Sequence, residues 1–152
     1  MIEDGRIRRP DTAFSVKKRK PIRGRQHDEK HLAFIRTLPC LVSGSRYCVE
    51  AAHIRYSDAA WGKVNPGVGK KPDDKWTVPL SAARHRLDPD SQHNSDERDF
   101  WERHGIDPLP IARALWLASG NYEEGMKIIL SAINDRRDVE NNVPAELVGE
   151  RA

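Results

Sequence analysis

The sequence predicts an α+β domain: a small β-hairpin followed by a helix, surrounded by several further helices and preceded by a basic arm. Three observations predict it. Short apolar segments flank a Ser-Gly turn within residues 40–53, a glycine-rich stretch separates them from a helix start near Ser81, and amphipathic segments run from residue 95 to residue 133. Short strands followed by helical periodicity are typical of a small sheet covered by helices.

Length and charge predict one folded domain with charged ends. The chain has 152 residues, of which 32% are charged, and a mean hydropathy of −0.74, so its core is modest. Residues 1–27 hold nine Lys or Arg against three Asp or Glu, although the whole chain carries only +3. We expect a basic, flexible arm over 1–26, a domain over 27–136 and a charged tail over 137–152. The arm favours contact with a phosphate backbone, and a solubilising or localisation segment is the alternative.

The lengths of the apolar runs and the two cysteines indicate the cellular compartment. No run approaches the roughly 20 apolar residues that a membrane-spanning helix needs, and the first residues are polar and basic rather than signal-like. The sequence therefore favours a cytoplasmic protein without a membrane partner. In a reducing cytoplasm Cys40 and Cys48 are expected to be buried thiols rather than a disulfide. Half of a zinc site, completed by histidines, is the alternative.

The remaining elements follow from capping residues and periodicity. Asp28, Ser81 and Ser95 are expected to cap helices, because their side-chain oxygens can accept hydrogen bonds from free amides of the first turn. In a strand that ends at His53, alternation places Ala51 on the same face as this histidine. The expected elements are a helix over 27–37, strands over 40–42 and 47–53, a short extended piece over 76–80, a short helix over 82–86, and helices over 96–103, over 107–118 and from 121 onward.

A long loop over 55–75 separates the second strand from the short helix. It contains three glycines, which allow a backbone to approach phosphate closely, and four lysines, which can neutralise it. A loop of this length in a small domain is typically functional or disordered. We expect it to lie along DNA, with Lys70 and Lys71 contacting the phosphates.

Three histidines suggest a metal-dependent hydrolase. His53 ends the second strand, and His85 and His93 follow the loop. Two or three imidazoles or carboxylates can hold a divalent metal, and a further imidazole can act as a base near neutral pH. The alternative is that His53 fills a niche in the core and the other two lie on the surface.

Ordered blocks of sequence resemble the HNH (ββα-metal) nucleases of phages and prophages. The resemblance covers roughly residues 30 to 106. The blocks that carry it are Leu38-Pro39-Cys40-Leu41-Val42-Ser43-Gly44, Glu50-Ala51-Ala52-His53-Ile54-Arg55-Tyr56, Gly69-Lys70-Lys71-Pro72-Asp73-Asp74-Lys75-Trp76, Val78-Pro79-Leu80-Ser81, Gln92-His93 and Glu97-Arg98-Asp99-Phe100-Trp101.

The resemblance implies roles for individual residues. His53 corresponds to the general base, and His85 and His93 to metal ligands on the helix. Asp73 or Asp74 can orient the base, the task of the family's middle asparagine, and we assign it to Asp74. Arg55 and Arg84 are candidates to hold the scissile phosphate. For Asp73 and Asp74 the alternative is loop solvation or helix capping, and for Arg55 and Arg84 it is an ordinary surface position.

The chain also departs from the family pattern. A metal ligand commonly precedes the base, but Ala52 occupies that position and cannot coordinate a metal. The two helix histidines of related sequences lie one turn apart, whereas His85 and His93 are eight positions apart, with Pro89 between them. We expect the extra residues to bulge so that both imidazoles converge; a degenerate site is the alternative. The zinc-binding cysteines of many HNH proteins are replaced by Ser43 and Ser81.

The function predicted from the sequence is a metal-dependent DNA endonuclease. Two imidazoles suit Zn²⁺, Ni²⁺ or Mn²⁺ better than Mg²⁺, and the sequence leaves all four open. The first alternative is a DNA-binding module that descends from a nuclease and has lost its metal. The second is a structural zinc protein that uses Cys40, Cys48 and histidines and has no role on DNA.

Overall fold

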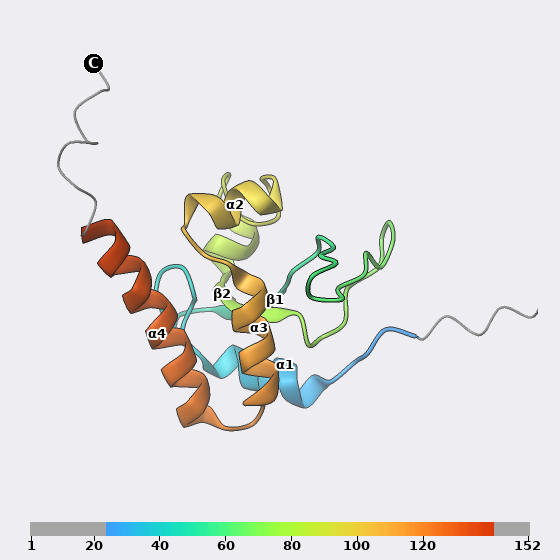
Figure 1. Ribbon diagram of the computed structural model, residues 1–152, viewed down its shortest axis with the longest axis horizontal. Helices are drawn as coiled ribbons and strands as arrows, with labels where there is room; N and C mark the ends of the chain where they lie inside the picture. Colours follow the sequence, from blue (N-terminus) through green and yellow to red (C-terminus); the bar gives the residue numbers. More distant parts are fainter. Residues whose placement is uncertain (1–23, 142–152) are drawn as a thin grey trace, which may run out of the picture.

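The computed structural model describes residues 24–141, which form a small α+β protein (Figure 1). Most of the predicted basic arm and of the charged tail lies outside these residues. No helix within the described part is long and apolar enough to cross a bilayer. The elements in chain order are α1 (Glu29–Thr37), β1 (Val49–His53), β2 (Thr77–Ser81), the π-helical turn η1 (Ala83–Leu87), α2 (Glu97–Arg103), α3 (Pro108–Leu117) and α4 (Tyr122–Asn141).

The sheet pairs β1 with β2 in antiparallel register, from Val49 opposite Ser81 to His53 opposite Thr77. The predicted pairing of 40–42 with 47–53 is therefore wrong. Residues 41–43 form a turn, in which the Gly44 amide donates to the Cys40 carbonyl. Tyr47 is 81% exposed and Cys48 has a φ of +47°, a conformation that a strand cannot contain. The strand therefore starts only at Val49 and pairs with the fully buried β2.

Helix capping follows the sequence at some ends and not at others. Asp28 caps α1 by accepting from the His31 amide, as expected, and Asp107 caps α3. Asp96, and not the expected Ser95, caps α2. Ser81 is the last residue of β2, so the turn that follows has no strong side-chain cap. This turn is π-helical rather than α-helical, so the helical turn that carries His85 is wider than an α-helical one.

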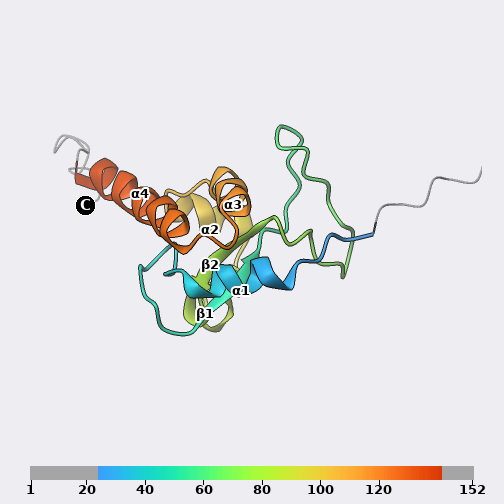
Figure 2. The same cartoon turned by 90° about the horizontal axis from the view of Figure 1, so that it is seen from below.

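Helices cover the sheet and leave one loop projecting. Helix α1 packs against both strands, and α3 packs against β2 and α4. The largest fully buried side chains include Phe100, Ile35, Leu80 and Leu115, contributed by α2, α1, β2 and α3. Figures 1 and 2 show the loop that joins β1 to β2 extending from the body on the side away from α4. The core therefore holds β1 firmly while its end, at His53, faces the base of this loop.

Gly125 of α4 packs directly against side chains of α1 and of the residue that caps it. A Cβ at this position would lie 2.7 Å from Cζ of Phe34 and 3.0 Å from Cδ2 of Leu38. Alanine would favour the helix by about 1 kcal/mol, but overpacking a core costs about 1–3 kcal/mol. The gain in helix propensity offsets part of the overpacking cost. We therefore expect Gly125→Ala to lower the free energy of unfolding, measured by urea denaturation, by about 1 kcal/mol. Ser131→Ala on the exposed face of α4 serves as the control, and a Gly125→Ala protein as stable as that control would contradict this packing.

Candidate functional site

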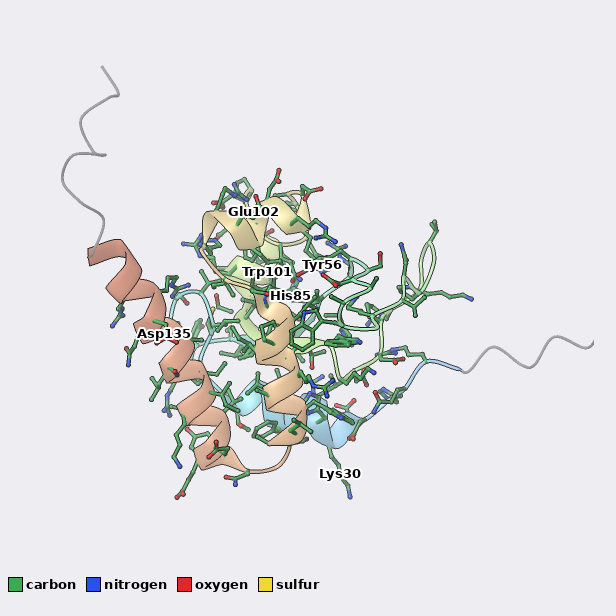
Figure 3. The ribbon with its side chains drawn as sticks, viewed as in Figure 1. Lys30, Tyr56, His85, Trp101, Glu102 and Asp135 are labelled. Carbon is green, nitrogen blue, oxygen red and sulfur yellow. The ribbon has the colours of Figure 1, made fainter. Side chains whose placement is uncertain are left out.

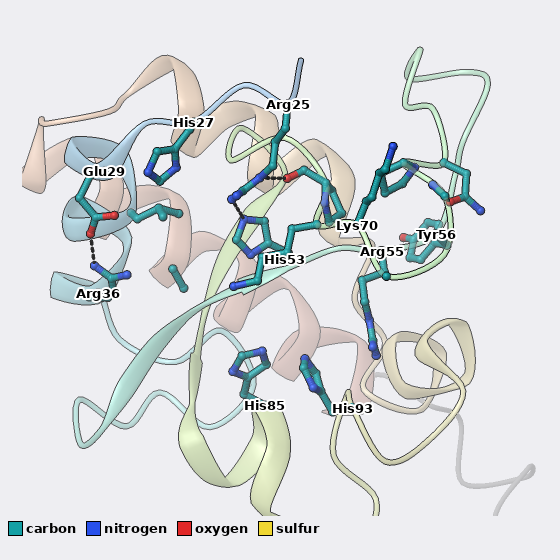
Figure 4. Close-up of a pocket in the computed structure, with 18 residues that line it drawn as sticks. Arg25, His27, Glu29, Arg36, His53, Arg55, Tyr56, Lys70, His85 and His93 are labelled. Carbon is teal, nitrogen blue, oxygen red and sulfur yellow. Dashed lines mark hydrogen bonds and ion pairs between the residues drawn. The ribbon is translucent and has the colours of Figure 1, made fainter. Parts of the chain in front are cut away.

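A cavity of about 810 Å³ lies beside β1, between the start of the described chain, the projecting loop and the segment that follows η1 (Figure 4). Its lining is rich in cations and histidines. Figure 3 shows that His85, which lines this cavity, lies near the middle of the molecule, whereas Lys30 and Glu102 point outward. The lining includes Arg25, His27, Ala51, His53, Arg55, Tyr56, Lys70, Lys71, His85 and His93.

His53 reaches the cavity because of strand alternation. Ala51 and His53 line the cavity, whereas Ala52 and Ile54 are fully buried in the core. The predicted faces of this strand are confirmed. The Nε2 atom of His53 lies 2.7 Å from Oδ1 of Asp74. With its Nε2 proton donated to this carboxylate, the ring carries its lone pair on Nδ1, which makes no hydrogen bond to any residue between 24 and 141. The pair can thus accept a proton at Nδ1 in the tautomer that the carboxylate fixes.

Asp74 is fully buried but well satisfied. Its Oδ2 accepts hydrogen bonds from Nδ1 of His27, at 2.7 Å, and from the Asp28 amide, at 2.8 Å. The guanidinium of Arg25 pairs with Oδ1. Burial acts to raise the pKa of Asp74, but these hydrogen bonds and the one from His53 outweigh it and lower the pKa to about 2. Asp74 is therefore an anion that holds the imidazole of His53 throughout the physiological pH range.

The pKa of His53 is lowered from its ordinary value of 6.5. Burial is the largest cause, because it disfavours the imidazolium. Asp74 opposes it by stabilising the charged ring, while the positive charges of Arg25 and Lys71 lower the pKa further. His53 is consequently neutral at pH 7 and has a proton-accepting nitrogen available.

Sequence reasoning missed Arg25, which it placed in the basic arm. Its Nε donates to the Pro72 carbonyl at 2.8 Å, and its Nη2 lies 3.3 Å from Nε2 of His53 (Figure 4). The neighbouring Gln26 amide donates to Asp73, and the Gln26 carbonyl accepts from the Asp74 amide. Residues 25 and 26 thus belong to the site. No apolar periodicity identifies such a segment, because polar hydrogen bonds hold it in place.

The insertion around Pro89 folds back on itself and brings His85 next to His93. The Gln92 amide donates to the Arg84 carbonyl at 3.0 Å, and the His93 amide donates to the His85 carbonyl at 3.1 Å. The two ring centroids lie 4.5 Å apart with an interplanar angle of 79°. In Figure 4 both imidazoles point toward His53. The two rings lie side by side, as expected, and their convergence on a metal stays a prediction.

Glu50 fixes the orientation of His85. Its Oε2 lies 2.6 Å from Nδ1 of His85, and Arg86 donates to both of its oxygens. Hydrogen bonds from Arg86 and His85 lower the pKa of Glu50, which keeps the carboxylate charged. With Nδ1 engaged, Nε2 of His85 is the nitrogen that remains for a ligand. A carboxylate behind an imidazole in this way is the usual support for a metal-binding histidine. Glu50 was present in the sequence motif, but no role was assigned to it.

The described residues fit a metal only in part. Between 24 and 141 no group of three or more His, Cys, Asp and Glu side chains is arranged to hold a metal ion. His85 and His93 could together provide two nitrogen ligands. Ala52 faces the core, so β1 adds no ligand at that position. A metal at this position would need its other ligands from water and substrate oxygens, and it would have one protein ligand fewer than catalytic zinc sites usually have.

The predicted phosphate-binding residues divide into two groups. Arg55, Lys70 and Lys71 line the cavity, and Nη2 of Arg55 donates to the Gln92 carbonyl at 3.2 Å. Arg84 does not line it and instead lies 3.7 Å from Asp88. Lys63, also in the loop, is buried and donates to the Tyr56 carbonyl. The loop is therefore partly a structural element, and its exposed cations are concentrated near 70 and 71.

Buried polar residues join the two histidine-bearing segments. Gln92 is fully buried, and its Nε2 donates to the His53 carbonyl at 3.0 Å and to Glu97 at 2.7 Å. Glu97 also accepts from the Arg55 amide. The spacing between His53 and His93 is therefore set by hydrogen bonds to the backbone, and not only by apolar packing.

The cysteines differ in their surroundings. Cys40 is buried, as expected, and its sulfur accepts from the Ser43 amide at 3.4 Å. Cys48 is exposed, so the expectation of two buried thiols is wrong for this residue. Its left-handed backbone at the start of β1 explains the exposure, because this conformation turns the chain at the surface.

Searches against protein-family models, curated proteins and solved structures return no match for this chain.

Proposed function

We propose that this protein is a metal-dependent DNA endonuclease. The observation that carries the proposal is the shared cavity: the His53–Asp74 pair lies on one side, and the imidazoles of His85 and His93 point toward it from the other. A base and a two-nitrogen metal site that face each other are the two components that phosphodiester hydrolysis needs.

The chain's own residues account for most of the reaction. Asp74 holds the proton on Nε2 of His53, so Nδ1 removes a proton from the attacking water. Arg55, Lys70 and Lys71 neutralise and position the scissile phosphate. His85 and His93 would hold the metal, with Glu50 orienting His85. A bound divalent cation polarises the phosphate and stabilises the charge on the leaving oxygen.

The proposal is tested with supercoiled plasmid. Protein stripped with EDTA is incubated with Mg²⁺, Mn²⁺, Ni²⁺ or Zn²⁺ in turn, and nicked and linear products are measured. Cleavage that requires an added metal supports the proposal. Intact plasmid with every metal, together with a salt-sensitive gel shift, would instead favour a DNA-binding module without catalytic activity. This module is the second candidate because residues 24–141 offer no third protein ligand for a metal.

The cations of the projecting loop predict a DNA-binding defect. Replacing Lys70 and Lys71 together by alanine is expected to weaken binding to a short duplex and to reduce the slope of log K against log salt by about 1.8, or 0.9 for each lost phosphate contact. Lys63→Ala is not a suitable control, because this lysine is buried. The matched control is Lys127→Ala, because Lys127 is exposed on α4 and lies outside the cavity. An unchanged slope in the double variant would exclude both lysines from the DNA contact.

A further inference from the structure

A second cavity, of about 220 Å³, is lined by three of the chain's four tryptophans. Trp61 comes from the loop between the strands, Trp76 precedes β2, and Trp116 lies near the end of α3. Trp76 is 4% exposed, whereas the other two rings are only partly buried. The remaining lining residues are Lys75, Arg113 and Leu117. The cavity thus joins the loop to α3, and its accessible aromatic surface comes from Trp61 and Trp116.

The charged residues that line this cavity, Lys75 and Arg113, are both cations. No acidic residue lines it, and neither Lys75 nor Arg113 forms an ion pair with any residue between 24 and 141. The Lys75 ammonium lies 5.2 Å from the centre of the Trp76 ring. A purely structural aromatic cluster does not require two cations without anionic partners. An anion beside an aromatic or planar group is the ligand chemistry that such a lining fits.

The size restricts the ligand. Pockets for drug-sized molecules have volumes of about 300–1,000 Å³, and this cavity, at about 220 Å³, is smaller. It suits one planar ring system with a charged group at its mouth. Bases of single-stranded nucleic acids stack on aromatic side chains while basic residues follow the backbone. A nucleotide combines both features.

We propose that this cavity binds an unpaired base of single-stranded DNA, stacked against Trp61 and Trp116, with its phosphate held by Lys75 and Arg113. The proposal rests on DNA being the substrate of the first cavity. Lys75 directly follows Asp74, the partner of His53, and the same loop carries Trp61 and Lys71. The protein would then prefer DNA that has a single-stranded segment beside the cleaved duplex, such as a gap or a displaced strand.

The test measures binding separately from cleavage. Fluorescence anisotropy of a labelled oligothymidylate and of a blunt duplex of equal length is recorded in EDTA, with the full chain carrying His53→Ala. We expect Trp61→Ala in this background to weaken binding of the oligothymidylate about tenfold and to change duplex binding less than twofold. Tyr47→Ala, which removes an aromatic ring that is 81% exposed and outside both cavities, should leave both affinities unchanged.

A second variant distinguishes loss of the binding site from misfolding. Arg113 is exposed on α3, so Arg113→Gln is expected to retain the melting temperature while weakening oligothymidylate binding at low salt. If both variants bind the oligothymidylate as the parent does, the base-binding site is excluded. Quenching of tryptophan fluorescence by a proline-rich peptide, with none by the oligothymidylate, would likewise overturn the proposal in favour of a peptide site. If the parent protein does not cleave plasmid but binds the oligothymidylate in a manner that depends on Trp61, the proposed nuclease activity is wrong and the base-binding site remains.

Discussion

Replacing His53 by alanine is expected to lower the rate of plasmid cleavage at saturating metal and DNA by a factor on the order of 10²–10⁴, the usual contribution of a general base. The ring is only partly buried, it donates one hydrogen bond to Asp74 and its Nε2 lies 3.3 Å from Arg25, so its loss removes the proton acceptor without opening the core. DNA binding should remain within about twofold of the parent, because Arg55, Lys70 and Lys71 are unchanged.

The pH dependence of the parent protein provides an independent check. A general base must be neutral, so the rate falls as the pH drops through the pKa of His53. Because burial lowers this pKa, the acid limb is expected below pH 6.5. The limb should disappear in the residual activity of His53→Ala. A variant that cleaves at the parent rate, or retains the same acid limb, would show that another group accepts the proton.

Lys71→Gln separates the pKa effect from DNA binding. The positive charge of Lys71 is one of the causes that lower the pKa of His53. Its removal is expected to move the acid limb of kcat toward higher pH, whereas a lysine that only contacts DNA would change KM alone. Lys127→Gln on α4 is the matched control for the loss of one lysine charge.

The sequence predicted the fold well where burial determines it. Apolar periodicity and the capping side chain of Asp28 placed α1, and strand alternation put Ala51 and His53 on the same face, which the structure turns toward the cavity. The wrong strand pairing came from the turn residues at 43–46, which favour a local hairpin. The partner strand instead lies across a loop of 23 residues, from 54 to 76, and a pairing at that distance in sequence depends on tertiary packing rather than on local turn chemistry.

In the candidate site, the three histidines and the contact of Asp74 with His53 were predictable from the sequence, whereas Arg25 and Glu50 were not. His53, His85 and His93 carry recognisable spacing, but the bulge that joins the last two depends on backbone hydrogen bonds across Pro89. Arg25 has no pattern of its own in the sequence. Glu50 stands in the motif, yet its contact with His85 exists only because β1 lies beside η1 in the folded chain. Polar partners distant in sequence leave no periodicity, so only the three-dimensional structure identifies them.

The second large effect is expected in the metal dependence. If Nε2 of His85 is a ligand, His85→Ala should raise the metal concentration for half-maximal cleavage by more than about 100-fold, because removing a ligand exceeds the 10–100-fold cost of removing its support. Glu50→Gln should give that smaller increase, since an amide holds the Nδ1 proton of His85 less strongly than a carboxylate. In both variants, the cleavage rate should rise toward the parent rate as added metal fills the metal site.

The comparison between these two variants separates a ligand from a structural role. If His85 only packs against His93, His85→Ala and Glu50→Gln would alter the melting temperature and leave the metal titration of the folded protein unchanged. Isothermal titration with Mn²⁺ or Zn²⁺ in the absence of DNA measures the affinity directly, and Glu29→Gln, on a carboxylate that pairs with Arg36 beside the same cavity, is the control. Identical titrations for His85→Ala and the parent would exclude this histidine from metal binding. They would also support the DNA-binding module, because the described residues offer no third nitrogen or carboxylate ligand to replace His85.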